Sequence, residues 1–384
     1  MPQGRLVPER APVGAPSIPG FSYVRPLGSG GFAQVFLYEQ DMPRRLVAVK
    51  VLNGAAKGSA AVEELREVFE SEADVMARLS SHPSVVSIYQ ASISLEGHPY
   101  LAMEFCPASM GALTKGQPAR LRDVLDAGVR IAGALETAHR AGVLHRDIKP
   151  SNVLLTTLGR PALSDFGIAQ VLGRRELDGE MAMSIPWSAP EVVGLQSTGS
   201  VATEVWSLGA TLYSFAAGRS PFELADRSQN SRSKLTERIS KALYQAIPGA
   251  QGYERFDELI AKALRKNPHE RYASMAEFGE ALQQLQRTFG YDVTPLEIVA
   301  EAWLPRAEAV PAGTRGPVVS TVGRVTRAEA RAEMLAQRRG TDDDGLILDR
   351  PASPWRAGLI GAGVALAVVA GAGSVIWAMS GGAG

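Results

Sequence analysis

The stretch from Val143 to Gly167, VLHRDIKPSNVLLTTLGRPALSDFG, is the feature that most constrains how this 384-residue chain can fold. An apolar Val-Leu-Leu run separates Asp147 and Asn152 from a second aspartate, Asp165. This pattern predicts a loop, a short strand and a second loop, which can aim the three side chains at one point. Phosphoryl transfer needs such a point, because hard metal ions bind oxygen ligands and a hydroxyl nucleophile needs a carboxylate beside it.

The motif HRD-x-K-x-x-N followed by DFG resembles the catalytic and metal loops of eukaryotic-type (Hanks-type) Ser/Thr protein kinases. The resemblance implies an α+β fold of two lobes, a β-rich N-lobe and an α-helical C-lobe, with ATP bound between them. It implies that Asp147 orients the substrate hydroxyl and that Lys149 lies beside the transferring phosphate, as in Ser/Thr-directed members. Asn152 and Asp165 would hold Mg²⁺, with Mn²⁺ as a second candidate. His145 would pack beneath the loop as a structural element.

Composition sets wide limits on partners and source. The chain carries 40 basic and 40 acidic residues, so its overall charge indicates no nucleic-acid partner. Its single cysteine, Cys106, excludes an internal disulfide and fits a reducing compartment. Arginine far outnumbers lysine, and alanine and glycine are abundant, as in GC-rich bacterial genomes. We therefore expect a bacterial, actinobacterial-like member of the family.

A glycine-rich segment near the N-terminus predicts the nucleotide site. From Phe21 the pattern indicates a strand, a glycine turn, a second strand and a third strand, RRLVAVKVL, that contains Lys50. The turn, GSGGFAQV, resembles the loop that covers the ATP phosphates, with Ala33 where the family has its third glycine. Alone it would be typical of an ordinary hairpin, but its place before VAVK favours the nucleotide interpretation. The resemblance assigns ATP contacts to Leu27, Gly28, Ser29, Gly30, Gly31, Val35, Ala48, Lys50, Met103, Glu104 and Cys106.

In the family, the lysine of this strand contacts the α- and β-phosphates and pairs with a glutamate on the next helix. The segment VEELREVFESEADVMARLSSHP predicts that helix. Glu72 is the chosen partner of Lys50 by its place in the family pattern, with Glu70 and Glu67 as alternatives. Further strands are predicted at Val85–Tyr89 and His98–Glu104, and a long helix at Leu121–Ala141. The second of these strands would lead into the hinge that binds adenine.

The segment between Asp165 and the Ala-Pro-Glu triplet at 189–191 corresponds to the activation segment of the family and contains no threonine. Ser184 matches the position whose hydroxyl contacts the catalytic aspartate, so we interpret it as structural. Negative charges at Glu176, Asp178 or Glu180 can stand in for a phosphate opposite Arg146. We therefore expect weak dependence on activation-loop phosphorylation, although a plain solvated loop explains these acids equally well.

Three features of the C-lobe follow the family pattern. Glu204 stands where the family has an aspartate that bonds the catalytic-loop backbone, so we expect that bond to be rearranged or lost. Arg271 is expected to pair with Glu191. Ser274 and Glu277 predict a capping box at the start of the last helix of the domain. A further short helix is predicted from the Thr-Pro-Leu-Glu sequence at 294–297.

The C-terminal region predicts a membrane anchor. Ala357–Met379 contains 23 residues without a charge, long enough to span a bilayer. Arginines precede it and no basic residue follows it, which predicts a cytoplasmic kinase on a single-pass cell-membrane protein. A small-residue stripe at Gly363, Ala367 and Gly371 raises the hypothesis of a homodimer. The predicted organisation is a disordered lead (1–20), a kinase domain (21–289), a juxtamembrane linker with short helices (290–356), a transmembrane helix (357–379) and an extracytoplasmic tail (380–384).

Two functions are compatible with these observations. The first is an ATP-dependent Ser/Thr kinase at the cytoplasmic face of the membrane that acts on protein hydroxyls, including its own. The second is a membrane-tethered pseudokinase scaffold that binds nucleotide or partners without transfer. Ala33, Glu204 and the threonine-free segment give the scaffold some weight. The retention of the lysine, the two aspartates and the asparagine favours the enzyme.

Overall fold

The computed structural model describes residues 15–29, 33–52, 73, 75–166, 184–247 and 253–299. The chain divides into two compact units, residues 1–309 and 310–384, and every described residue belongs to the first. Within these described ranges, no helix is both long and apolar enough to cross a membrane. The predicted membrane segment at 357–379 lies outside them, so its prediction stands untested.

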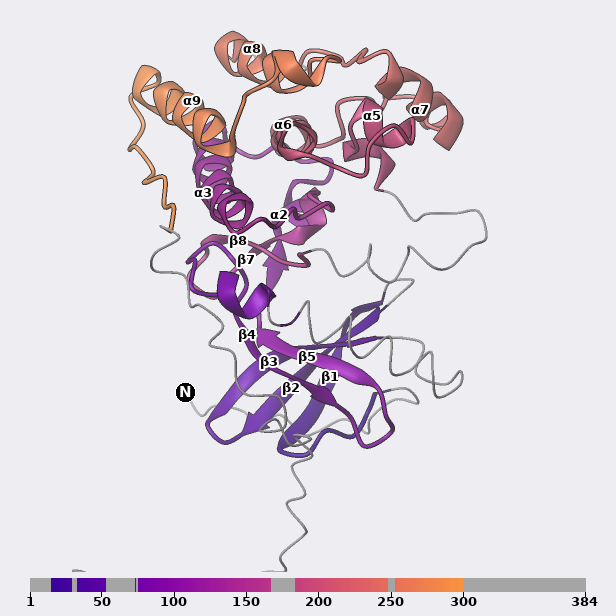
Figure 1. The fold of residues 1–384 in the computed structure, drawn as a ribbon, viewed down its shortest axis with the longest axis vertical. Coiled ribbons are helices and arrows are strands. Elements are labelled where there is room, and N and C mark those ends of the chain that lie inside the picture. The colour runs from indigo at the N-terminus through magenta and orange to yellow at the C-terminus, as the bar shows by residue number, and fades with distance from the viewer. Residues whose placement is uncertain are drawn as a thin grey trace, which may run out of the picture. The chain divides into compact units, whose positions relative to one another are not determined.

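The N-lobe is a five-stranded antiparallel sheet in the order β1-β2-β3-β5-β4 (Figure 1). Its strands are β1 (Phe21–Ser29), β2 (Ala33–Asp41), β3 (Arg44–Leu52), β4 (Ile88–Ile93) and β5 (Pro99–Glu104). Alternate residues of β2, β3 and β5 form one buried cluster, with Phe36, Val47 and Tyr100 among its members. The residues between them, such as Ala48, Leu101 and Met103, belong to a second buried cluster, so both faces of the sheet are packed. The three strands predicted around the glycine loop are confirmed.

The predicted strand at Val85–Tyr89 is displaced, since β4 begins only at Ile88. Val85 and Val86 are fully buried and precede the strand. The Val86 N–H donates to the Leu163 carbonyl at 3.0 Å, which ties this turn to the C-lobe. The apolar pair therefore lies in a buried turn that forms an isolated parallel bridge to Leu163, and it is not part of β4.

The segment before β1 corrects the prediction of a disordered lead over 1–20. Residues 15–20 pack on the sheet, with Ile18 only 3% exposed. The Tyr38 hydroxyl donates to the Pro16 carbonyl at 2.7 Å, and Glu96 accepts the Ser17 N–H at 2.9 Å. A proline-rich composition did not reveal these partners, because they lie on β2 and the β4–β5 turn. Residues 1–14 are outside the described part of the chain.

The C-lobe is mainly helical and also contains a small three-stranded sheet, which lies at its edge (Figure 1). The sheet contains β6 (Ala108–Ser109), β7 (Val153–Leu155) and β8 (Pro161–Leu163). The helices are α2 (Met110–Thr114), α3 (Leu121–Arg140), α5 (Pro190–Val193), α6 (Val201–Ala217), α7 (Arg232–Ser240), α8 (Glu254–Ala263) and α9 (Met275–Thr288). The described residues also include the 3₁₀ turns η1 (Pro150–Asn152), η2 (Ile185–Trp187), η3 (Arg227–Gln229) and η4 (Pro268–Glu270). The predicted helix at Leu121–Ala141 is confirmed.

Helix α6 forms the centre of this lobe. Ser200 and Thr203 make a reciprocal capping box at its start, and Gly218, with φ of 73°, ends it. Most of its residues are buried, and the Trp206 ring stacks on Phe222. A helix that is apolar on nearly all sides must lie in the core. This buried helix is the support on which the loops of the site are fixed.

Helix α9 begins as predicted at Ser274, whose hydroxyl accepts the Glu277 N–H at 3.0 Å. The return bond differs from the predicted capping box. The Glu277 carboxylate accepts the Ala273 N–H at 2.7 Å instead of the Ser274 N–H. Gly290, with φ of 67°, follows the helix as the expected stop.

The predicted helix at 294–297 is wrong, because residues 291–299 have no regular secondary structure. Thr294 is 5% exposed, and it forms hydrogen bonds with α3 and α9 instead of capping a new helix. Its hydroxyl donates to Asp126 at 2.7 Å and accepts from Gln286 at 2.8 Å, while its carbonyl accepts from Gln283 at 2.7 Å. These tertiary hydrogen bonds outweigh the local capping signal.

Candidate active site

The catalytic loop lies between α3 and β7, and Asp147 is its central residue. Its carboxylate contacts Lys149 Nζ at 2.7 Å and accepts the Ser184 hydroxyl at 2.8 Å. Lys149 also donates to the Ser184 oxygen at 3.0 Å. The three side chains therefore form a closed hydrogen-bonded triangle. The structural role predicted for Ser184 is confirmed by this contact.

Asn152 ends the turn η1 and is fixed to the same aspartate. Its amide nitrogen donates to the Asp147 carbonyl at 2.8 Å and to the Asp147 carboxylate at 3.1 Å. Proline at the first position of η1 shapes the turn, and Asn152 is 5% exposed. The amide oxygen accepts the Ser151 hydroxyl at 3.4 Å and keeps a second lone pair for another partner.

Asp165 follows β8 in a left-handed backbone conformation, with φ of 63°. The Lys50 ammonium contacts its carboxylate at 2.7 Å across the two lobes. Burial alone would raise the pKa of Asp165, but the charge and hydrogen bond of Lys50 lower it below the usual range. The structure thus brings Lys50 and Asp165 together, a contact that the motif analysis did not specify. The predicted Lys50 partner, Glu72, lies outside the described residues, so that pairing stays a prediction.

His145 is fully buried beneath the loop and packs on Phe166, with ring centroids 4.5 Å apart. The Asp147 N–H donates to its Nδ1 at 3.2 Å, so Nε2 carries the proton that is donated to the Ser164 carbonyl at 2.8 Å. Burial lowers the pKa of this imidazole and keeps it neutral. This geometry confirms His145 as a structural element.

Glu204 corrects the prediction of a rearranged or lost bond. One carboxylate oxygen accepts the Arg146 N–H at 2.6 Å, and the other lies 2.6 Å from His139 Nε2. The longer side chain therefore keeps the contact with the loop and gains a second partner on α3. His139 was missed by the sequence reasoning, although a histidine inside an apolar helix face such as that of α3 is a usable signal.

The predicted adenine and phosphate contacts are brought together by strand register. Gly28 lies opposite Val35, and Val35 lies opposite Lys50, on three adjacent strands. Ala48 lies opposite Met103 on β5, one residue before Glu104. Leu27, Val35 and Cys106 are partly buried against the same core cluster that contains Ala48 and Met103. Ser29 ends β1, whereas Gly30 and Gly31 lie outside the described residues.

Cys106 lies two residues beyond β5, at the predicted hinge. Burial raises the pKa of its thiol to about 12, with a smaller contribution from Glu104. Since the thiolate is the reactive form, this side chain is an inert apolar contact. The interpretation of Cys106 as a small hydrophobe agrees with this environment.

The predicted ion pair of the C-lobe is present. Arg271 donates to both oxygens of Glu191, at 2.7 and 2.9 Å, and its own side chain is 0% exposed. Burial would raise the pKa of Glu191, but hydrogen bonds from Arg271 lower it. The ion pair holds α5, the short helix that contains Glu191, against the end of η4.

The donor set fits a magnesium ion that also binds nucleotide. Asn152 and Asp165 offer two hard oxygen ligands, and no cluster of three or more acidic, histidine or cysteine ligands occurs among the described residues. Mg²⁺ in such sites is held by one or two protein oxygens together with phosphate oxygens and water. The residues present therefore suit a metal that arrives with ATP.

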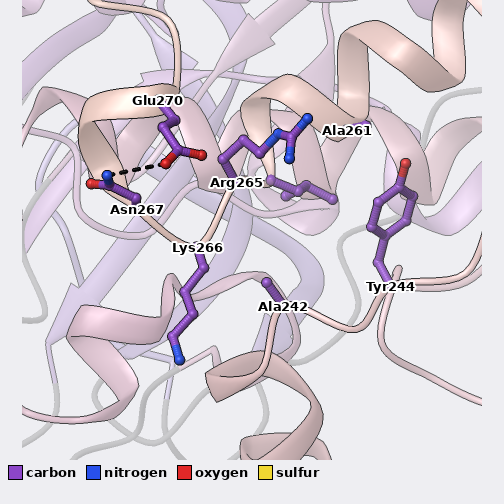
Figure 2. A pocket seen from close by; sticks show the side chains of 8 residues that line it. Ala242, Tyr244, Ala261, Arg265, Lys266, Asn267 and Glu270 are labelled. Atoms are coloured by element: carbon purple, nitrogen blue, oxygen red, sulfur yellow. Dashed lines mark hydrogen bonds between the residues drawn. The ribbon is translucent and has the colours of Figure 1, made fainter.

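A hollow of about 700 Å³ lies elsewhere on the C-lobe, between α8, η4 and the segment after α7. Figure 2 shows Tyr244, Arg265 and Lys266 around it, with Asn267 bonded to Glu270. It contains none of the predicted site residues. It is not the phosphoryl-transfer site.

Two lobes with a lysine on β3, an HRD loop and a DFG aspartate that meet in space define a protein kinase. The model of the protein kinase domain matches residues 21–285, and the chain belongs to this family. It is similar to the serine/threonine-protein kinase PknK of Mycobacterium tuberculosis (strain CDC 1551 / Oshkosh), with 36% identity over 75% of this chain and 25% of the relative. PknJ of Mycobacterium bovis shares 35% over 68% of this chain and 44% of the relative.

A third relative, PknA of Mycobacterium tuberculosis (strain ATCC 25177 / H37Ra), is 29% identical over 88% of this chain and 77% of the relative. The chain therefore spans about a quarter of the length of PknK and less than half of PknJ. These relatives support the expectation of a bacterial Hanks-type kinase.

Proposed function

We propose that the chain is an ATP-dependent Ser/Thr protein kinase that phosphorylates protein hydroxyls, including its own. The observation that carries this proposal is the triangle of Asp147, Lys149 and Ser184, with Asn152 bonded to the same carboxylate. All its side chains are held by hydrogen bonds before any substrate arrives. Such preorganisation is the main source of rate in phosphoryl transfer.

Each residue of the site has a distinct role in this proposal. Asp147 accepts the proton of the substrate hydroxyl and orients its oxygen towards the γ-phosphate. Lys149 stabilises the charge on the transferring group, and Lys50 anchors the α- and β-phosphates. Asn152 and Asp165 would hold Mg²⁺, which neutralises phosphate charge when bound. Lys50 must exchange its present contact with Asp165 for the phosphates when ATP binds.

The test is transfer of labelled phosphate from ATP to a Ser/Thr substrate by the full chain. Asp147→Asn should reduce the rate by about 10²–10⁴-fold and leave nucleotide affinity unchanged. Asp123→Asn, which alters a surface aspartate on α3 paired with Arg120, should behave as wild type. A chain that binds nucleotide and transfers nothing would instead be the scaffold. That alternative is not favoured, because all the catalytic side chains are retained.

We further propose that residues 357–379 anchor the kinase in the cell membrane with the catalytic domain in the cytoplasm. The support is the uncharged 23-residue length and the placement of arginines before it. The full chain should sediment with membranes and resist extraction by carbonate, whereas a chain ended at Arg356 should be released. Recovery of the full chain in the soluble fraction would contradict the anchor.

Two finer proposals concern assembly and activation. Gly363→Leu with Gly371→Leu should weaken self-association in membranes if the small-residue stripe forms a homodimer. Phosphatase treatment should leave most of the activity intact if Glu176, Asp178 or Glu180 replaces an activating phosphate. Loss of activity that maps to Ser184 or Ser188 would contradict the second proposal.

A further inference from the structure

A segment that follows α9, residues 291–299 (the strap), packs along α3 and α9. The two helices lie side by side (Figure 1). A Cβ atom on Gly133 of α3 would overlap the Glu297 carbonyl, and a Cβ on Gly279 of α9 would lie 2.7 Å from Leu296. The Val299 N–H donates to the Thr137 hydroxyl at 3.1 Å. Glycine is therefore required where the strap backbone crosses α3.

Glu297 connects the strap to two elements beyond these helices. Its carbonyl accepts the Nε2–H of His82 at 2.8 Å, and its carboxylate accepts from Arg160 at 3.2 Å. Arg130 lies 4.0 Å from the same carboxylate. His82 is 1% exposed, and the Ser84 N–H donates to its Nδ1 at 3.0 Å. The imidazole is therefore fixed with its Nε2 proton pointing at the strap.

The turn that contains His82 and the segment that contains Arg160 are both connected to Asp165, the proposed metal ligand. His82 begins the turn before β4, in which the Ser84 carbonyl accepts the Leu163 N–H at 2.9 Å and the Val86 N–H donates back to Leu163 at 3.0 Å. Arg160 directly precedes β8, and Leu163 ends it two residues before Asp165. Glu297 thus holds both the turn and the strand on which Asp165 depends.

We infer that Glu297 is a positioning residue for phosphoryl transfer, and that a docked strap is needed to align Asp165. The inference rests on the proposed kinase activity. Because the Glu297 carboxylate is 35% exposed, its ion pairs contribute little net stability, and its role is one of alignment. Release of the strap from α3 would therefore lower activity without unfolding the domain.

The first test compares two helix substitutions in the full chain. Gly133→Ala forces the strap away from α3, while Gly209→Ala places a Cβ 2.8 Å from that of Ala263 and leaves the strap untouched. Hydrogen exchange should quicken at the amides of Val86 and Leu163 in the first variant alone. We expect kcat to fall about tenfold or more in Gly133→Ala.

A second pair of variants avoids the core. Glu297→Lys places three cations together with Arg130 and Arg160, and should release the strap. Asp292→Lys, the same change at a fully exposed strap residue, should leave kcat and exchange as in wild type. A strap whose amides exchange freely while Val86, Leu163 and kcat remain as in wild type would overturn the inference.

The two proposals fail in different ways. If wild type transfers no phosphate, the proposed function is wrong. The exchange at Val86 and Leu163 still decides whether the strap aligns β8, because that measurement needs no catalysis. If wild type is active and Glu297→Lys is equally active with an undocked strap, only the positioning role of Glu297 is wrong.

Discussion

Glu204 on α6 accepts the backbone N–H of Arg146 at 2.6 Å and fixes the catalytic loop from below. Arg146 has φ of 67°, a left-handed conformation that a residue other than glycine adopts at a cost. Contacts from neighbouring residues must therefore stabilise this loop conformation. The buried Glu204 carboxylate contributes by accepting the Arg146 N–H. His139 holds the other oxygen of the same carboxylate at 2.6 Å.

Glu204→Ala should impair both stability and catalysis. The Arg146 N–H and the His139 ring would lose a buried partner, which costs about 1–3 kcal/mol of unfolding free energy. The freed loop should also reduce kcat by about tenfold or more. Urea denaturation and phosphate transfer measure the two effects. Glu280→Ala, at an exposed position on α9, is the control, and an unchanged kcat in Glu204→Ala would refute the role assigned to this residue.

Ser184→Ala should slow transfer without altering ATP binding. The serine hydroxyl bridges Asp147 and Lys149, and one hydrogen bond to a charged group contributes about 1.5–3 kcal/mol, or roughly 10- to 150-fold in rate. Steady-state kinetics should show a lower kcat at constant KM for ATP. Ser188→Ala removes a hydroxyl that, among the described residues, bonds the Ser184 carbonyl and neither Asp147 nor Lys149, and it should retain wild-type kcat. Equal losses in both variants would contradict the bridge.

The Glu191–Arg271 pair predicts acid sensitivity. The pKa of Glu191 is lowered in the folded protein, where Arg271 outweighs the effect of burial. The unfolded chain binds its proton near pH 4.3, so below that pH it holds more protons than the folded protein. The contribution of this pair is therefore fully present above about pH 4.3 and is lost as the pH falls through the folded pKa.

Glu191→Gln separates this effect from general acid unfolding. At pH 7 it should cost about 3–5 kcal/mol of unfolding free energy, because Arg271 stays buried without its charge partner. Below pH 4 the variant should lose stability less steeply than wild type. Urea denaturation across pH, with Glu280→Gln as the control, measures both quantities. An equal slope in the two proteins would show that Glu191 does not titrate differently on folding.

The sequence predicted those parts of the fold and site that depend on contiguous patterns. The β-strands around Lys50 follow from alternation, and α3 follows from helical periodicity. Ser184 and the Glu191–Arg271 pair could be predicted because each occupies a fixed place in a motif. For Ser184 and for the Glu191–Arg271 pair, the family pattern specified the interaction partner, and local secondary-structure propensity did not.

The remaining features depend on partners that are distant in the sequence. The reach of Glu204 is set by His139 on another helix, so side-chain length alone gave the wrong outcome. Thr294 carried a local helix-start signal, but its hydroxyl is taken by Asp126 and Gln286. Ile18 is buried only because β2 and the β4–β5 turn hold its neighbours. The structure at such positions is determined by tertiary contacts and not by local secondary-structure propensity.

Cys106 should resist alkylation while the protein is folded. Its thiol pKa of about 12 leaves almost no thiolate at pH 8, whereas an unperturbed cysteine with a pKa near 8.5 is partly ionised there. Iodoacetamide at pH 8 should therefore label the chain at least about tenfold faster in denaturant than in buffer. Because the chain has one cysteine, intact mass reports this site directly. Rapid labelling of the folded protein would mean that the hinge is open to solvent, and that Cys106 does not line a closed adenine pocket.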